Sequence, residues 1–300
     1  MHVLCFKKIQ MINLAKLKGP APSHKYMKLF EGVEYDIKSP KHDLIKRMAM
    51  LRRSSTRRFE TSEIFVKGLH TINAHIAAGA TFSEILVTAE NKLWATRKFE
   101  SCQNVKRVPR EVLQYLVYDR PFHAKQDDAQ LVVGITQMPT LHDISQGLTA
   151  GNYLVLESIQ DPKNVANLVA TAHGMRWQGV IPLDKTCDFF EWKSLEAGSG
   201  AVSKIPLFKK PKTLAEVVSA AVKAKLLPLV GHIEGVEPTA IDRSSYRGVL
   251  LLVGNEGQGP SQQALELFSR VTIPMAKAVN SLNVAIAGGI LMNVLTQARV

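Results

Sequence analysis

The stretch GVLLLVGNEGQGPS, residues 248–261, joins a run of apolar residues directly to a turn rich in glycine. The six residues GVLLLV (248–253) are typical of a strand that is buried on both faces of a sheet. Glycines in the turn that follows let the main chain come close to a bound molecule and offer it amide groups. The sequence therefore predicts a buried strand that leads at once into a ligand-binding loop.

This turn does not match the common nucleotide-binding patterns. Its glycines stand at 254, 257 and 259, whereas the dinucleotide fingerprint has the order G-x-G-x-x-G and the phosphate loop ends in G-K-[ST]. Glu256 inside the turn would repel a pyrophosphate but would favour a cationic ligand. A tight turn without any ligand is the alternative interpretation.

Apolar runs and helical segments alternate on both sides of this stretch. Predicted strands are 153–159, 179–183, 227–233, 248–254 and 270–275, and predicted helices are 163–175, 212–225, 260–269 and 282–297. This order is typical of an α/β fold with a parallel sheet covered on both faces. Ligands bind such sheets outside the carboxyl ends of the strands. We therefore expect the loops after residues 159, 253 and 275 to lie together.

The first and third of these loops also contain polar residues at informative positions. In DPKN (161–164) the aspartate and the proline are typical of a helix start, and Asn164 falls in the first turn. In the third loop Asn280 or Ser281 is predicted to cap the next helix, where Asn283 needs a polar partner. Capping and close helix packing alone would explain each loop without a function.

The first part of the chain divides into three segments. Residues 1–60 form a basic extension, 61–138 a small α/β domain, and 139–152 a linker rich in turn formers, before a second domain at 153–300. Within the small domain, strands are predicted at 63–67, 83–88, 104–108 and 129–136, with helices at 68–80, 93–100 and 109–118.

Positive charge is concentrated in the extension. Residues 1–60 hold 14 Lys and Arg against 5 Asp and Glu, whereas residues 61–300 hold 24 against 21. Residues 40–60 are predicted to form a basic helix and an arm or linker that contains RRSSTRR. Such a segment attracts the phosphates of nucleic acid, and a solvated tail is the alternative. The first 30 residues lack acids and carry six lysines, which favours a mitochondrial targeting segment over a secretory signal.

Other classes of site and location are disfavoured. The three cysteines, Cys5, Cys102 and Cys187, lie far apart, so no disulfide framework is expected and a reducing compartment is favoured. The nine histidines show no metal-ligand spacing, and no metal is expected. No run of about 18 apolar residues predicts a membrane span.

The three loops together, in the order D-P-x-N, G-N-E-G-x-G and I-P-M-x(5)-S-L-N-V, resemble the SpoU/TrmH family of RNA ribose 2′-O-methyltransferases. Within that family the chain is most similar to the mitochondrial and bacterial large-subunit rRNA enzymes, over residues 61–297. The resemblance implies a SPOUT methyltransferase domain with a trefoil knot at 153–300, preceded by an L30e-like RNA-binding domain at 61–138. It also implies a dimer in which each active site is completed across the interface.

The resemblance further implies S-adenosylmethionine as cofactor and large-subunit rRNA as the partner. Carried over to this sequence, the cofactor-binding residues are Gly254, Asn255, Gly257, Ile273, Met275 and Leu282. The implied catalytic positions are Asn164, Glu256, Ser281 and Asn283.

Two positions depart from the family pattern D-P-x-N-x-G-x-x-x-R. The glycine is Ala166 here and the arginine, which the family uses near the ribose, is Ala170. Two interpretations follow. The chain methylates RNA with another group, such as His173, Arg176 or a residue of a partner subunit. Alternatively it is a catalytically impaired homologue that binds RNA as a ribosome assembly factor or as one subunit of a heterodimer.

Overall fold

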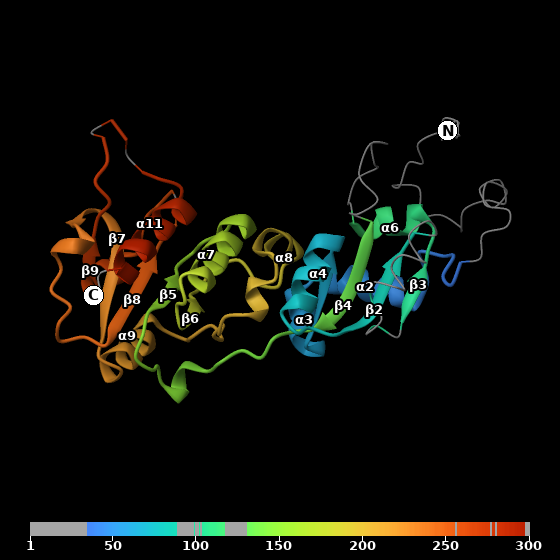
Figure 1. Cartoon of the computed structure of the whole chain (residues 1–300), viewed down its shortest axis with the longest axis horizontal. Helices are drawn as coiled ribbons and strands as arrows, with labels where there is room; N and C mark the ends of the chain where they lie inside the picture. The colour runs from blue at the N-terminus through green and yellow to red at the C-terminus, as the bar shows by residue number, and fades with distance from the viewer. Residues whose placement is uncertain are drawn as a thin grey trace. The chain divides into compact units, whose positions relative to one another are not determined.

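A computed structural model describes residues 35–88, 99, 102, 104–117, 131–255, 257–276, 278–279 and 281–297 (Figure 1). The described chain divides into two compact units, the first built mainly from residues up to 137 and the second mainly from residue 138 onward. Most of the basic extension, residues 1–34, lies outside the described residues.

The first unit contains a mixed four-stranded sheet with the order β1-β4-β2-β3. Its strands are β1 (Glu63–Lys67), β2 (Phe82–Val87), β3 (Val105–Arg107) and β4 (Val132–Gln137). Strand β4 is antiparallel to β1 and β2, whereas β2 and β3 are parallel. Helices α4 (Leu69–Ala77) and α6 (Arg110–Val117) occupy two of the predicted helical segments. The helix predicted at 93–100 falls almost entirely outside the described residues.

Two further helices belong to this unit, and they correct the predicted extent of the basic extension. Helix α2 (Asp43–Arg53) buries Ile45, Met48 and Leu51 and packs against β1, and α3 (Ser55–Thr61) follows it. The three apolar side chains are spaced by three residues and so form one face of the helix. Residues 43–61 are therefore part of a folded core, and the lysines and arginines between the apolar positions conceal this in the sequence.

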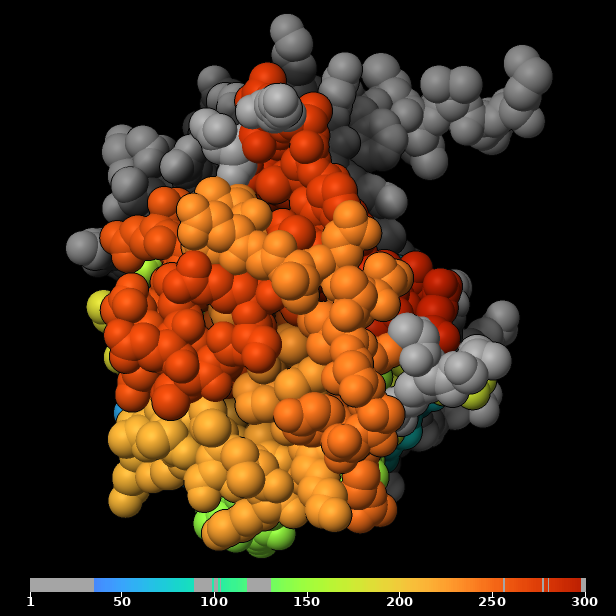
Figure 2. Space-filling view, turned by 90° about the vertical axis from the view of Figure 1, so that its left-hand side faces the viewer, coloured from blue at the N-terminus to red at the C-terminus, as the bar shows by residue number. Residues whose placement is uncertain are grey.

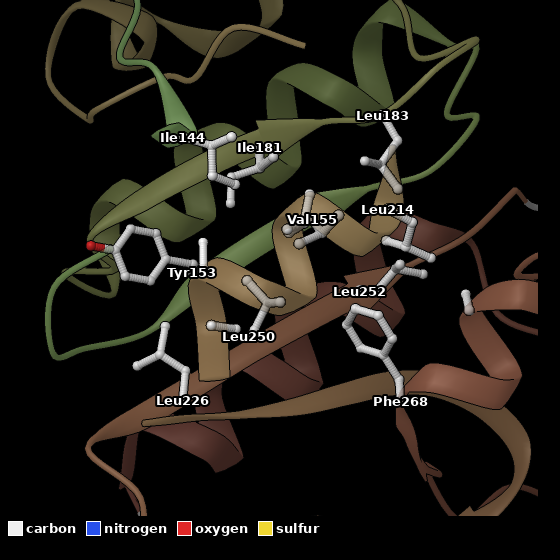
Figure 3. Close-up of a cluster of buried hydrophobic side chains, with 14 of the residues drawn as sticks. Ile144, Tyr153, Val155, Ile181, Leu183, Leu214, Leu226, Leu250, Leu252 and Phe268 are labelled. Carbon is white, nitrogen blue, oxygen red and sulfur yellow. The ribbon is translucent and has the colours of Figure 1, made fainter. Parts of the chain in front are cut away.

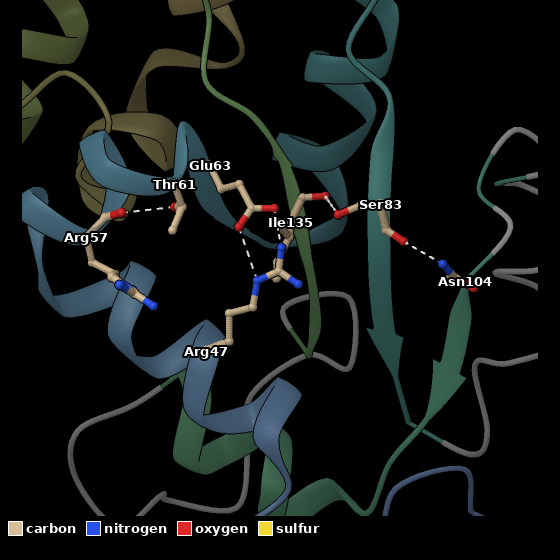
Figure 4. Close-up of polar contacts among 7 residues, drawn as sticks. All are labelled: Arg47, Arg57, Thr61, Glu63, Ser83, Asn104 and Ile135. Atoms are coloured by element: carbon tan, nitrogen blue, oxygen red, sulfur yellow. Dashed lines mark hydrogen bonds and ion pairs between the residues drawn. The ribbon is translucent and has the colours of Figure 1, made fainter.

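Polar contacts tie α2 to the sheet (Figure 4). The guanidinium of Arg47 donates from Nε and Nη2 to the two carboxylate oxygens of Glu63 at the start of β1, the Nε bond being 3.1 Å long. Across the sheet Ser83 donates to the carbonyl oxygen of Ile135 at 3.3 Å, and Asn104 donates to that of Ser83 at 3.1 Å. The helix and the strands are thus joined by polar as well as apolar contacts.

The second unit is built on a five-stranded sheet with the order β6-β5-β8-β7-β9, in which all neighbouring strands are parallel. The strands are β5 (Tyr153–Leu156), β6 (Gly179–Pro182), β7 (Leu226–Val236), β8 (Gly248–Val253) and β9 (Ser269–Val271). The helices are α7 (Pro162–Gly174), α8 (Trp192–Gly198), α9 (Leu214–Lys223), α10 (Gln262–Leu267) and α11 (Val284–Gln297). An α/β fold with a parallel sheet is confirmed, and α8 lies in a stretch for which the sequence predicts no element.

Both faces of this sheet are covered, which explains why its strands are continuously apolar. Leu250 and Leu252 of β8 point into a core that also contains side chains of α9 and α10, including Leu214 and Phe268 just after α10 (Figure 3). Helices α7 and α11 pack against each other, and α11 contacts β8 and β7. All six residues of β8 are buried.

The segment predicted as a linker, residues 139–152, is packed on the second unit. Ile144, in the short 3-10 helix η4 (Ile144–Gln146), is only 8% exposed and joins the core shown in Figure 3. The amide of His142 donates to the carbonyl oxygen of Leu207 at 2.8 Å, and Lys209 donates back to His142 at 2.8 Å. Ile144, with Leu148 packed against the same core, and these main-chain bonds fix the segment in spite of its turn-forming composition.

Candidate functional site

The structure brings parts of all three predicted loops to the carboxyl edge of the parallel sheet. Strands β5 and β8 are neighbours, so the loops that follow them start side by side. The side-chain amide of Asn255 donates to the carbonyl oxygen of Ser158 at 3.0 Å. The end of the third loop reaches helix α7, which follows the first loop, through a hydrogen bond between Asn283 and Asn164.

The glycine loop, defined as residues 254–261, closes tightly on itself. The side-chain oxygen of Asn255 accepts hydrogen bonds from the amides of Gly257 at 2.8 Å and Gln258 at 3.1 Å, and Gly259 donates to the Asn255 carbonyl at 2.9 Å. A Cβ atom on Gly254 would lie 2.6 Å from the nitrogen of Pro260, so only glycine fits there. Asn255 therefore shapes the loop with its side chain. Glu256 lies outside the described residues.

Asn164 and Asn283 join helices α7 and α11. Asn164 is 8% exposed, and its side-chain oxygen accepts a hydrogen bond of 3.1 Å from the side-chain amide of Asn283. The oxygen of Asn283 accepts from the amides of Ala285 at 2.9 Å and Ile286 at 3.3 Å. Asn283 thus caps α11, a role that the sequence assigned to Asn280, which lies outside the described residues, or to Ser281.

The third loop projects from the sheet between β9 and α11 (Figure 1), and Figure 2 shows this red segment rising above the orange surface. Strand β9 ends at Val271, earlier than predicted, so that Ile273 and Met275 lie in the loop. Its start is held by Thr272, whose amide donates to the Val236 carbonyl at 3.0 Å. Ile273, Met275 and Leu282 are half-buried, whereas Ser281 is exposed.

Helix α7 places the positions that depart from the family pattern. Asp161 caps the helix by accepting from the amide of Lys163 at 2.9 Å. Ala166 is buried against α8, where a Cβ added to Gly198 would lie 3.6 Å from the Cβ of Ala166. Ala170 is half-buried. Arg176 lies beyond the end of α7 and before β6, and so at the opposite edge of the sheet from the three loops. Arg176 is therefore remote from the glycine loop of its own chain.

Two contributors at this edge were missed in the sequence. Glu157, one residue after β5, accepts hydrogen bonds from the amide of Ser261 at 2.8 Å and from its hydroxyl at 2.6 Å. The connection from β6 to α8 also reaches the first loop, since Cys187 donates its amide to the Ile159 carbonyl at 2.8 Å. A glutamate that ends a strand, followed 104 residues later by a serine that starts a helix, has no recognisable local pattern.

The β6–α8 connection also holds an exposed ion pair. Lys210 donates to Asp184 at 3.0 Å. This hydrogen bond is the main reason why the pKa of Asp184 lies below its usual value, and the amide of Lys185 acts in the same direction. Asp184 follows β6, so the pair lies at the same edge of the sheet as the three loops and adds no net charge there.

The described part of the chain shows neither a metal site nor a membrane span. Within it, no three His, Cys, Asp or Glu side chains are grouped so as to hold a metal ion. No helix among the described residues is both long and apolar enough to cross a membrane.

Comparisons with known proteins agree with this architecture. Residues 151–293 match the model of the SpoU rRNA Methylase family. The 23S rRNA (guanosine(2553)-2′-O)-methyltransferase RlmP of Bacillus subtilis is 25% identical over 265 residues, which cover 85% of this chain and 97% of that protein. An "Uncharacterized tRNA/rRNA methyltransferase" of Synechocystis is 27% identical over 266 residues, covering 85% of this chain and 91% of its own.

Solved structures share the fold over most of the chain. The AdoMet-bound rRNA methyltransferase from Sinorhizobium meliloti superposes with a TM-score of 0.71 at 23% identity, covering 88% of this chain and 98% of that one. The SpoU methyltransferase AviRb from Streptomyces viridochromogenes gives 0.73 at 21% identity, covering 86% and 98%. These findings confirm the resemblance seen in the loops. The second unit of this chain therefore belongs to the SpoU rRNA methylase family.

Proposed function

We propose that this chain transfers a methyl group from S-adenosylmethionine to a ribose 2′-hydroxyl of RNA, and that its substrate is the rRNA of the large ribosomal subunit. The observation that carries the proposal is the meeting of the glycine loop with the Asn164–Asn283 pair at the carboxyl edge of the sheet. The glycine loop and both asparagines lie within residues 151–293, which match the model of a family of rRNA methylases. The printed activity of RlmP supports the substrate class.

The residues at this edge fit the proposed cofactor. A Cβ on Gly257 would meet only the Asn255 side-chain oxygen at 3.4 Å, and one on Gly259 would meet nothing within 4 Å, so the loop has an open side that a ligand can approach. The loop contains no lysine or arginine, which disfavours a phosphate cradle. Half-buried Ile273, Met275 and Leu282 supply apolar surface for an adenosyl group.

When bound, the cofactor supplies a sulfonium methyl group, which passes to the ribose oxygen as the sulfur–methyl bond breaks. The chain's own part is to hold the cofactor with main-chain groups of the glycine loop, and to hold the ribose so that its 2′-oxygen lies in line with the sulfur–methyl bond. It must also let the hydroxyl proton leave. Ala170 has no group that can bind a proton or a phosphate. We propose that transfer is consequently slow, with the proton leaving to solvent or to an RNA phosphate.

The alternative function is favoured by the same alanine. In that case the chain binds RNA, and the cofactor, without transferring the methyl group. It would then act as an assembly factor of the ribosome or as one subunit of a heterodimer whose other subunit supplies the arginine. The Asn255 and Asn283 contacts described above would serve binding equally well.

We also propose the trefoil knot and the dimer that the resemblance implies. Support for the knot comes from Arg243, between β7 and β8, which donates to the Leu295 carbonyl of α11 at 2.7 Å, so that this connection lies against the C-terminal helix. Support for a dimer comes from α11, where Ile286 and Ile290, one turn apart, are 57% and 40% exposed. Light scattering that gives twice the mass of one chain is expected.

For the first unit we propose the L30e-like RNA-binding role, and for the whole protein a mitochondrial location. The mixed sheet with its packed helices supports the first proposal, and the acid-free lysine-rich start of the sequence supports the second. Expression of the full chain fused at its C-terminus to a fluorescent protein tests the location, and exclusion from mitochondria would contradict it.

The proposed function is tested by incubating the full chain with S-adenosylmethionine labelled on its methyl group and deproteinised ribosomal RNA. We expect label in the large-subunit rRNA as an alkali-stable 2′-O-methyl nucleotide, above a control without protein. RNA binding without any transfer would support the alternative. Failure to bind either RNA or cofactor would contradict both functions.

The basic extension gives a separate prediction about RNA binding. Deleting residues 1–34 removes six lysines and stops short of α2, so the first unit should stay folded. We expect weaker RNA binding and a shallower dependence of log K on log salt, because each lost phosphate contact lowers the slope by about 0.7–0.9. A slope equal to that of the full chain would instead assign the segment to targeting or to binding of a protein partner.

A further inference from the structure

Glu157 places a buried carboxylate against the far end of the glycine loop. Its main-chain amide donates to the Val253 carbonyl at 3.0 Å, which continues the pairing of β5 and β8 by one residue. The residue is 9% exposed, and both of its carboxylate oxygens accept hydrogen bonds from Ser261. A buried carboxylate is tolerated only while such donors satisfy it. The two residues therefore hold each other in place across 104 positions of sequence.

The glycine loop is thus fixed at both ends to consecutive residues of the first loop. At its start, Asn255 donates to the Ser158 carbonyl. At its end, Ser261 donates to Glu157 and its hydroxyl also accepts from the amide of Ala264 at 3.2 Å, at the beginning of α10. Between these two anchors the turn exposes its glycines on the open side. The contacts are polar and specific, so they select one conformation of the loop.

We propose that Glu157 is a positioning residue, whose carboxylate holds the glycine loop in the conformation that presents main-chain groups to S-adenosylmethionine. This inference rests on the proposed function. A loop that is ordered before binding loses less conformational entropy when the ligand arrives. If the Glu157–Ser261 contact is broken, only a fraction of molecules has the competent loop, and the apparent Kd rises by the inverse of that fraction.

A glutamine at 157 separates this role from simple space filling. Glutamine has nearly the same volume, and its amide oxygen can still accept from the Ser261 amide. Its NH2 group, however, would face the Ser261 hydroxyl, which must then accept instead of donating, and the charge-assisted bonds are replaced by weaker neutral ones. Because Glu157 is occupied by Ser261, the transfer step itself should be spared. We expect E157Q to raise the Kd and KM for S-adenosylmethionine by about tenfold, with kcat at saturating cofactor within about twofold of the wild-type value.

The experiment compares the full-length wild type with E157Q, S261A and S261T by calorimetric titration with S-adenosylmethionine. Hydrogen exchange at the amides of residues 257–259 is measured in the same proteins without cofactor. We expect weaker binding and faster exchange in E157Q and S261A, with recovery in S261T, which keeps the hydroxyl. The double variant E157Q/S261A should bind S-adenosylmethionine no worse than E157Q alone, since both substitutions act on the same Glu157–Ser261 contact.

The matched control is E216Q. Glu216, on α9, also accepts a main-chain hydrogen bond, from Lys212 at 3.1 Å, but does so away from the glycine loop. The affinity of E216Q for S-adenosylmethionine and its hydrogen exchange at residues 257–259 should equal those of the wild type. Wild-type affinity and exchange in both E157Q and S261A would overturn the positioning role while leaving the proposed function intact. A wild type that does not bind the cofactor would overturn the proposed function, and with it the role of Glu157 toward that ligand.

Discussion

Replacing Gly254 with alanine is expected to weaken S-adenosylmethionine binding by about 10- to 100-fold, a free-energy change of roughly 1.4–2.7 kcal/mol. The new Cβ would lie 2.6 Å from the nitrogen and 2.7 Å from the Cα of Pro260 and 2.9 Å from the carbonyl carbon of Gly259. All three are main-chain atoms, so the loop must open to relieve the clash. Isothermal titration with the cofactor measures the effect directly.

The control for this change is Gly174→Ala. Gly174 ends α7, a Cβ there would meet nothing within 4 Å, and its main chain does not adopt a positive φ. Its cofactor affinity should match that of the wild type. Wild-type affinity in Gly254→Ala, with a thermal midpoint also unchanged, would show that the glycine loop does not form the cofactor site.

Replacing Ala170 with arginine is expected to raise kcat for RNA methylation by roughly 100-fold, the lower end of the range for a positioned proton-transfer group. The resemblance places an arginine at this position near the ribose, and Ala170 is half-buried on α7, so a longer side chain can leave the helix toward solvent. Single-turnover transfer of labelled methyl to rRNA separates this change in rate from a change in RNA affinity.

Asn167→Arg is the matched control, because it adds the same charge to an exposed position of the same helix. It should improve RNA binding slightly and leave the transfer rate unchanged. If Ala170→Arg is no faster than the wild type and the wild type is already active, another group assists the proton transfer. His173→Ala would then identify or exclude the histidine in the last turn of α7.

The parallel sheet could be predicted because burial on both faces makes its strands continuously apolar. Residues 248–253 show this clearly, and β8 spans the same six residues. The meeting of the three loops followed from the same prediction, since parallel strands end at a common edge. The family resemblance then named the residues in those loops, of which Asn255, Asn164 and Asn283 make contacts between loops or helices.

The rest depended on contacts that leave no local pattern. Glu157 meets Ser261 only after the chain has crossed the sheet and returned, so neither residue is distinctive alone. The sequence predicts a basic helix in the region of α2 but assigns it to the extension, because four Lys and Arg residues accompany its apolar face, although Met48 and Ile45 are fully buried. The sequence predicts the cap of α11 too early, since Asn280, Ser281 and Asn283 are all good capping residues and only the fold decides that Asn283 fills the role.

The double duty of Asn283 bears on how such motifs survive evolution. Removing its side chain would leave the first turn of α11 without its cap, at a cost of about 1 kcal/mol, and would also remove a hydrogen-bond donor to the buried Asn164. Natural selection for a stable protein would therefore preserve both asparagines even in a lineage that had abandoned catalysis. Ala170 makes no such structural contribution. In a lineage that loses enzymatic activity, substitutions would therefore appear at position 170 first, while the neighbouring motif residues are retained.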